Sequence, residues 1–508
     1  RQYFGLSIYD ISAQDTTDLS DTCAQIALPA ILIRLLDAVI RRGELSKNEH
    51  SQLCQLRSTL CERFVLSFKA LNESDPLQTK YCLFFSLALS MLARDYRTGI
   101  AGTRDLIKCA GYAQQCINGE KKLNIPKADG YLQVALCLNA RMEDMLNVTD
   151  TKMNGTLPFS SQLADAVREA VRDYHEGSMY KRDEAVRTFR RNLFPRWKPS
   201  LGNVLACCDI FQIILEAAYE KYVSAANQNN QNYQAIARLG YVSKAYLVLA
   251  AIGTSGGALN LLAQMLINQA NQYEADQRIP FFRRHPDIGT FVQQHAAPYG
   301  WPLNDNYALA YRVLQIVCGI QRGSQPYSHM KKAELVLKGY VSESSSTQLT
   351  SLNIAINGGL AMGHYWKGRL LLEQAKQDHD RCNDYKDAAI ASFCATNVTE
   401  RFDHLPENAD EDAAPQLSPP QWLSAIELLR YPDREVFRVD RRMVFQTIYQ
   451  KLTQQVEEVQ SDRIQIHNER YRLTKKDVRS NMERCLDMVK VQFPDKEPLI
   501  QEMIRSIR

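Results

Sequence analysis

Apolar residues recur at helical spacing along almost the whole chain, and strand-like alternation is nearly absent. The stretch 21–42 shows this period and ends in Arg42 and Gly43, a cation and a glycine of the kind that end helices. Pro29 is expected to kink this helix or to mark its first turn. The pattern therefore predicts a long first helix.

A second helix is predicted directly after the first one. Ser46 and Glu49 have the spacing of a capping box, in which each side chain bonds the other residue's backbone N–H. Apolar residues then follow at steps of three and four, which places them on one helix face: Leu53, Leu56, Leu60, Phe64 and Phe68. The two helices form a hairpin with a short loop, and similar patterns recur along most of the chain.

Two stretches interrupt the helical pattern. Residues 227–232 are all Asn or Gln and predict a polar loop, whereas residues 405–421 are acidic and rich in proline, which is typical of a linker. We therefore divide the chain into N-terminal helical hairpins, a repeat region, a linker and a C-terminal helical domain. Their bounds are 1–160, 161–402, 403–421 and 422–508.

The C-terminal domain carries a short heptad pattern. Five apolar residues are spaced 4, 3, 4 and 3 apart, and Arg463 then breaks the series: Phe445, Tyr449, Leu452, Val456 and Val459. Because this pattern is too short for a stable coiled coil, a small helical bundle is favoured over a short coiled coil.

One segment has the composition of a repeat unit built from two antiparallel helices. Small residues in its first half let two backbones approach closely, Tyr365 fills the space between the helices, and Phe393 packs from the second helix. The residues of this unit are Gly359, Ala361, Gly363, Tyr365, Gly368, Asp384, Tyr385, Ala388, Ala389 and Phe393. This segment resembles the Sel1-like repeat, a relative of the tetratricopeptide repeat.

Degenerate copies of the same pattern occur around Tyr174, Ala237 and Tyr311. The resemblance implies an all-α fold, an irregular α-solenoid of antiparallel helix hairpins, in which neighbouring hairpins share one core. It also implies a scaffold or adaptor role, because such proteins typically bind partner proteins along a concave surface. Gly363 and Lys367 depart from the family pattern, which has Ala and Leu at those positions.

The charge of the chain excludes few classes of function, and its cysteine content favours a reducing compartment. The 61 basic and 57 acidic residues give a net charge of +4, too balanced to indicate nucleic acid or membrane binding by charge alone. The 13 cysteines form no CxxC pair, and Cys54 with Cys61, like Cys109 with Cys116, shares a helix face as buried thiols do. We expect a cytoplasmic protein, or one secreted into a host cytosol. Because residue 1 is Arg and not Met, the sequence leaves open whether a targeting signal precedes it.

No transmembrane segment is predicted. The longest uncharged stretch, Ala245–Tyr273, is interrupted by Gly253, Gly256 and Gly257, and each half is shorter than the roughly 20 residues of a membrane span. A buried pair of helices explains this stretch better.

The sequence contains no P-loop, dinucleotide-binding fingerprint, nucleophile elbow or HExxH motif, so we expect no cofactor and lean towards a non-catalytic protein. Asp378, His379, Asp380, Cys382 and Asp384 are the densest group of potential metal ligands. A solvated loop between helices explains them better than a metal site.

The candidate binding residues are aromatic and basic. Arg190, Arg191 and Trp197 belong to one segment that mixes cations with aromatic rings, and Arg283 and Arg284 belong to another. Such segments can bind anionic lipid headgroups or nucleic acid. Both lie next to prolines and are more simply explained as loops.

Trp366 and His364 flank Tyr365 on the predicted repeat helix. Their side chains point away from the Tyr365 face, so an exposed Trp366 would be an interface anchor. Packing against the next repeat explains this residue more simply.

The leading hypothesis is a non-catalytic scaffold that binds an unidentified protein partner. The alternatives are an enzyme on an atypical helical fold, such as a secreted bacterial effector that modifies a host protein, and a phosphoinositide-binding or nucleic-acid-binding protein that uses the basic-aromatic loops.

Overall fold

The computed structural model is all-helical within the residues that it describes, and no strand occurs among them. This confirms the predicted all-α class. The chain forms two compact units, Arg1–Leu259 and Asn260–Arg508, called unit 1 and unit 2 below. The structure describes residues 21–42, 47–100, 102–125, 128–147, 161–193, 215, 218–219, 222–228, 230–253, 255–276, 306–320, 325–403, 415, 417–460 and 475–507.

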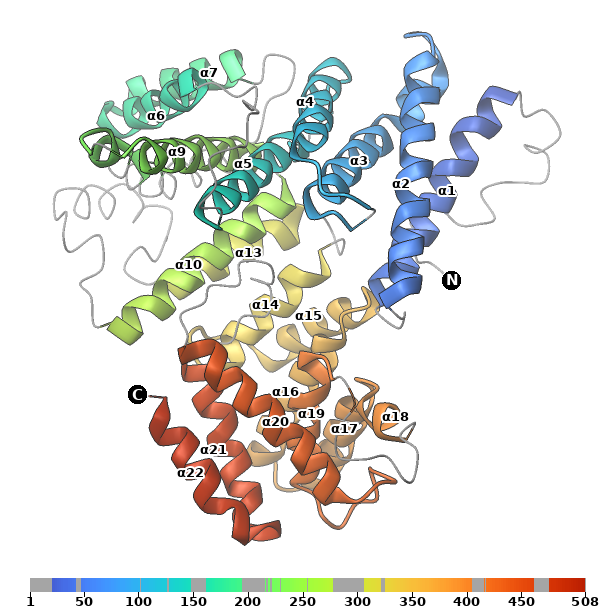
Figure 1. Cartoon of the computed structure of the whole chain (residues 1–508), viewed down its shortest axis with the longest axis vertical. Coiled ribbons are helices and arrows are strands. Elements are labelled where there is room, and N and C mark those ends of the chain that lie inside the picture. Colours follow the sequence, from blue (N-terminus) through green and yellow to red (C-terminus); the bar gives the residue numbers. More distant parts are fainter. Residues whose placement is uncertain are drawn as a thin grey trace. The chain divides into compact units, whose positions relative to one another are not determined.

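In unit 1, helices that follow one another in the sequence pack side by side from α1 to α5, as Figure 1 shows in blue to teal. Helix α9 then packs against both α5 and α6. The helices are α1 (Asp21–Arg42), α2 (Lys47–Ala70), α3 (Pro76–Thr98), α4 (Leu106–Lys122), α5 (Asp129–Asn147), α6 (Ser161–Glu176), α7 (Met179–Leu193), α9 (Gln231–Ile252) and the start of α10 (Gly256–Asp276).

The predicted first hairpin is present as α1 and α2, and Pro29 lies inside α1. The loop between them, with Gly43 and Ser46, lies outside the described residues. A buried ion network joins the hairpin to α3: Arg57 donates to Asp37 at 2.8 Å and to Asp95 at 2.7 and 2.8 Å. Because a buried charge is stable only when it is paired, this network fixes the three helices in one arrangement.

The cysteine pairs of unit 1 are buried, as their spacing predicted. Cys54, Cys61, Cys109 and Cys116 are all inaccessible to solvent. Burial raises the pKa of Cys61 to about 12, so its thiol stays protonated and packs as a small apolar group.

The long uncharged stretch of the sequence forms two helices separated by a short break. Helix α9 ends at Ile252 and α10 begins at Gly256, and α9 is capped at its start by the Asn230 side chain, which accepts from the Tyr233 N–H at 3.1 Å. Among the described helices, α9 alone is long and apolar enough to cross a membrane, but 61% of its apolar window is buried inside the protein. A buried core helix can have the same length and apolar composition as a membrane span.

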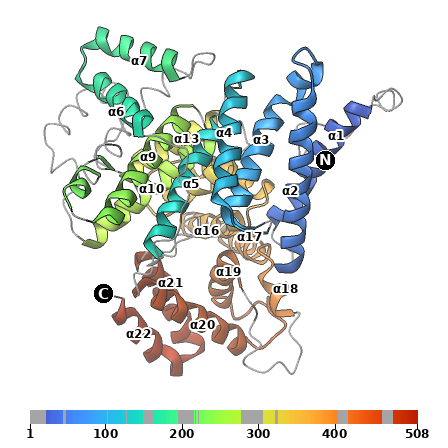
Figure 2. The same cartoon turned by 45° about the horizontal axis from the view of Figure 1, so that its top comes forward.

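In unit 2, packing again follows the sequence from α13 to α18, and α19 packs against α16, α17, α18, α20 and α21. Figure 2 shows the C-terminal helices in red. The helices are α13 (Asn306–Ile320), α14 (Pro326–Leu337), α15 (Ser345–Asn357), α16 (Ala361–Gln377), α17 (Cys382–Cys394), α18 (Val398–Asp403), α19 (Pro419–Leu429), α20 (Arg441–Gln460), α21 (Lys475–Gln492), the 3-10 turn η5 (Pro494–Lys496) and α22 (Glu497–Ser506). Sequence-order packing in both units is compatible with an α-solenoid.

The predicted repeat unit corresponds to the hairpin α16–α17. Gly368 lies directly against the Phe393 ring, where a Cβ atom would approach Phe393 Cε1 to 2.5 Å. Tyr365 is 1% exposed, and its ring centroid lies 6.1 Å from that of Phe393. Ala389 is buried, but Ala388 is exposed and takes no part in the contact. The small residue therefore has the role that the sequence predicted, which is to let two helices approach closely.

Residues on both sides of the predicted linker 403–421 contribute to one hydrophobic cluster, which runs from Met330 to Ile507. The prolines at the end of this segment begin a buried helix: Pro419 occupies the first turn of α19, and Ser418 and Gln421 form its capping box. The division between the two compact units falls between Leu259 and Asn260 in the sequence.

Candidate functional site

A pocket of about 270 Å³ opens in unit 2 between α14, α16, α19 and α21. We call it the unit 2 pocket. Helices that are far apart in the sequence supply its walls, so no local motif could have predicted it. Its lining residues are Met330, Lys331, Glu334, Leu337, Lys338, Tyr340, Met362, Tyr365, Trp366, Arg369, Pro419, Leu423, Asp477, Ser480, Asn481 and Arg484.

Local sequence signals position the helices around the pocket. Helix α14 starts with Pro326 in its first turn, and the chain reverses after it at Gly339, whose φ of +78° favours glycine. Helix α16 packs closely on α15 at Gly363, where a Cβ atom would lie 3.0 Å from Ile356 Cγ1. These backbone features position the end of α14, which carries Lys338, and helix α16, which carries Trp366.

One wall of the pocket is a chain of alternating charges. Glu334 accepts from Lys331 at 3.0 Å, and Lys338 pairs with Glu334 at 3.0 Å and with Asp477 at 2.7 Å. The pair between Lys338 and Asp477 joins α14 to α21 across 139 residues of sequence. Four charges of alternating sign therefore close this side of the pocket.

Two charges of this wall, on Glu334 and Lys338, are held in the ionised state by their neighbours. Burial of Glu334 opposes its ionisation, but the ammonium groups of Lys331 and Lys338 outweigh burial and lower its pKa. Burial of Lys338 favours its neutral form, but Glu334 and Asp477 outweigh burial and raise its pKa above the usual value. Neither side chain therefore exchanges a proton readily near neutral pH.

The opposite wall is an arginine cluster around one buried carboxylate. Glu427 on α19 is 1% exposed, and its oxygens lie 3.2 Å from Arg484, 3.2 Å from Arg430 and 3.6 Å from Arg369. The Tyr365 hydroxyl accepts from Arg484 at 2.9 Å and from Arg369 at 3.2 Å. Arg484 thus joins α21 to both α16 and α19.

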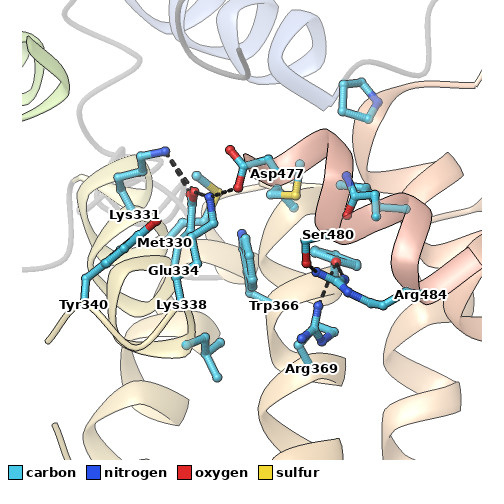
Figure 3. Close-up of a pocket in the computed structure, with 16 residues that line it drawn as sticks. Met330, Lys331, Glu334, Lys338, Tyr340, Trp366, Arg369, Asp477, Ser480 and Arg484 are labelled. Carbon is cyan, nitrogen blue, oxygen red and sulfur yellow. Dashed lines mark hydrogen bonds and ion pairs between the residues drawn. The ribbon is translucent and has the colours of Figure 1, made fainter. Parts of the chain in front are cut away.

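Trp366 stands between the two walls, as Figure 3 shows, with Lys338 and Asp477 on one side and Arg369 and Arg484 on the other. Its side chain is 8% exposed, and the Lys338 Nζ lies 5.9 Å from its ring centroid. The indole Nε1 is buried and has no hydrogen-bond partner among the described residues. This N–H is inaccessible to solvent, so it is the face of the Trp366 ring, and not its donor, that a group in the pocket would contact.

No family model, curated protein or solved structure matches this chain. The function must therefore be argued from the geometry of the site, since no relative supplies it.

The structure decides between the two alternatives for Trp366, an exposed interface anchor and a packed side chain. The side chain is mostly buried and lines the unit 2 pocket, because the helix places both Tyr365 and Trp366 against neighbouring helices. His364 is half-buried, and burial, with a smaller contribution from Lys367, lowers its pKa. His364 does not line the pocket.

Only part of one basic-aromatic segment is described. The expected loop is wrong for Arg190 and Arg191, because both lie in the last turn of helix α7 in unit 1. Trp197, Arg283 and Arg284 lie outside the described residues. The predicted lipid or nucleic-acid surface is therefore not tested by the structure.

The acidic group Asp378, His379 and Asp380 occupies the turn between α16 and α17, where His379 and Asp380 are exposed. Across the described residues, no group of three or more His, Cys, Asp or Glu side chains is placed to hold a metal ion.

Sequence reasoning missed Glu427, Arg369 and Arg484. One signal was present: Glu427 is the only charged residue in the apolar helix 419–429, and a single charge in a buried run requires a partner. Nothing in the sequence indicates that its partners come from α16 and α21.

Proposed function

We propose that this protein is a non-catalytic interaction protein that binds a segment of a partner protein in the unit 2 pocket. The observation that carries this proposal is the pocket itself, in which the mostly buried Trp366 ring lies between two charged walls. At about 270 Å³ it is smaller than the roughly 300–1,000 Å³ of typical small-molecule sites, so its size suits one or two partner side chains.

The electrostatics of the pocket favour binding over catalysis. A general acid or base works best when its pKa lies near the working pH. The pKa of Glu334 is instead lowered, although burial opposes this, by its lysine partners, and the pKa of Lys338 is raised against burial by its acidic partners. Glu334 and Lys338 therefore act as fixed charges that hold this wall of the pocket in place.

The finer family assignment is also part of this proposal. The α16–α17 hairpin has the Gly368–Phe393 contact and the buried Tyr365 that a Sel1-like repeat requires, and this supports a Sel1-like relationship and an adaptor role. The cysteines of the described residues are free thiols, which supports a reducing compartment such as the cytoplasm.

A pocket-filling variant tests the proposal. Leu337 lines the pocket and is only partly buried, whereas its neighbour Val336 is also partly buried but does not line it. We expect Leu337→Trp to remove a stoichiometric partner that co-purifies with the wild-type chain, and Val336→Trp to retain it. Quantitative mass spectrometry of the purified complexes measures both. Identical partners for the two variants, or no partner for the wild type from any source, would contradict the proposal.

A further inference from the structure

The arginine cluster of unit 2 carries more positive charge than its own partner neutralises. Arg369, Arg430 and Arg484 all make ion pairs with Glu427, a single carboxylate. The cluster therefore has two positive charges in excess. Arg369 and Arg484 line the pocket and are 19% and 22% exposed, so part of this excess charge faces the cavity.

Hydrogen-bond donors at this end of the pocket are also in excess. Arg484 donates from Nη1 to Tyr365 and Glu427 and from Nη2 to Ser480, which leaves two of its five N–H groups without a side-chain acceptor among the described residues. Arg369 and Arg484 both donate to the Tyr365 hydroxyl, which brings the two guanidinium groups together at this end of the pocket. An acceptor group bound here would meet several donors at once.

The remaining lining limits the shape of that acceptor. On the opposite wall Glu334 and Asp477 are paired with Lys331 and Lys338, so this wall adds no net charge and the arginines set the preference for an anion. Met330, Met362 and Leu423 line the cavity and provide apolar surface. An apolar chain can occupy this surface while its charged end reaches the arginines.

We infer that the unit 2 pocket binds a carboxylate carried on an apolar aliphatic or aromatic chain, with the carboxylate at Arg369 and Arg484. The planar fork of an arginine matches the two oxygens of a carboxylate, and such charged hydrogen bonds are roughly twice as strong as neutral ones. This inference rests on the proposed function, because it identifies the part of the partner that enters the pocket. A chain terminus and an acidic side chain both supply this chemistry.

A matched pair of small probes tests the chemistry. The full chain is labelled with 5-fluorotryptophan, and the Trp366 signal among the four tryptophans is assigned with Trp366→Phe. Titration with 4-phenylbutanoate should shift this ¹⁹F signal, and the uncharged 4-phenylbutanamide should bind at least about 10-fold more weakly, because it lacks the charge. Equal affinity for the acid and the amide, or no binding of either, would overturn the inference.

Conservative variants separate recognition from folding. Arg369→Lys keeps the positive charge but loses the planar fork, and it should weaken 4-phenylbutanoate binding by about 5- to 10-fold. The control, Arg479→Lys, changes an exposed arginine of α21 that pairs with Glu483, and it should leave binding unchanged. An unaltered affinity in Arg369→Lys, with its folded ¹⁹F spectrum retained, would also overturn the inference.

Two peptide arms identify the source of the carboxylate. One peptide ends in leucine with a free carboxyl group, and the other has an amidated end and one internal glutamate. Binding of either peptide supports the inference, and binding of neither contradicts it. If neither peptide binds but Leu337→Trp still removes the co-purifying partner, only the carboxylate inference is contradicted and the proposed function stands. If a peptide binds but Leu337→Trp retains the partner, only the proposed function is contradicted.

Discussion

Arg484 on α21 lies 3.2 Å from Glu427 on α19, and this ion pair joins two helices whose contacting residues are 57 positions apart. Burial of the Arg484 guanidinium favours its neutral form, but the neighbouring Tyr365 and Glu427 outweigh burial and raise its pKa. The pair thus stays charged inside unit 2, and the carboxylate of Glu427 determines whether three arginines can lie close together.

Removal of the Glu427 charge should therefore destabilise unit 2. We expect Glu427→Gln to lower the free energy of unfolding by about 3 kcal/mol, the usual cost of leaving buried charges unpaired. Urea unfolding of the full chain measures the loss, and faster hydrogen exchange in α19 and α21 assigns it to unit 2. Glu435→Gln, at an exposed position, is the control, and an equal loss in both variants would argue against the cluster.

The contact between Gly368 and Phe393 predicts opposite effects of alanine at two helical glycines. A Cβ at Gly368 would lie 2.5 Å from the Phe393 ring, so Gly368→Ala should destabilise unit 2 by about 1–2 kcal/mol despite its better helix propensity. Gly319 in α13 has nothing within 4 Å of its Cβ position, and Gly319→Ala should be neutral or stabilise by up to about 1 kcal/mol. Thermal unfolding compares the two, and stabilisation by both would contradict the predicted close approach.

The buried ion network of unit 1 should be sensitive to loss of its only fully buried cation. Arg57 is 2% exposed and pairs with Asp37 and Asp95. Arg57→Met leaves both carboxylates without this partner, and we expect a loss of about 3–5 kcal/mol in unfolding free energy. Arg63→Met, at an exposed position of α2, should change stability by less than about 0.5 kcal/mol. Similar denaturation midpoints for the two variants would show that the network contributes little.

A buried carboxyl group should make unit 1 less stable at alkaline pH. Burial, and then the nearby Asp129, raise the pKa of Glu120 to about 8. Because the folded state binds this proton more tightly than the unfolded state, its contribution is fully present below the ordinary pKa of about 4.5 and is lost as pH rises through 8. The unfolding free energy should fall over this window with a slope of up to about 1.4 kcal/mol per pH unit.

Glu120→Gln tests this pH dependence, because the amide cannot ionise. The variant should show a flatter stability profile between pH 5 and 8, as measured by urea unfolding at a series of pH values, whereas Glu169→Gln at an exposed site should keep the wild-type slope. An unchanged slope in Glu120→Gln would mean that another group is responsible.

The sequence predicted the helices well because helix formation depends on local spacing. The 3.6-residue period predicted the helix that the structure describes over Asp21–Arg42, and the small residue Gly368 correctly indicated a close helix contact. Each of these features depends on residues within one or two helical turns. The sequence was less informative for the Pro-rich segment 403–421. Its last prolines belong to a linker-like stretch, yet Pro419 also begins the buried helix α19.

The unit 2 pocket could not be predicted from local pattern. Trp366 was identified as a binding residue, but its position between the two walls depends on how α14 and α21 pack around it. The pairing of Lys338 with Asp477 joins residues 139 positions apart, and a single sequence contains no record of such contacts. Long-range ion pairs are set by tertiary packing and become visible only in the structure.

Site-specific photo-crosslinking at the pocket tests the central claim most directly. A benzophenone side chain is placed at Leu337, inside the pocket, or at Val336, outside it, and the full chain is illuminated in its native lysate. The proposed function predicts one dominant partner adduct from position 337 and little of that adduct from position 336, and the carboxylate inference adds that excess 4-phenylbutanoate reduces the adduct from 337. The same adducts from both positions, or none from 337, would contradict the claim that a partner enters the unit 2 pocket.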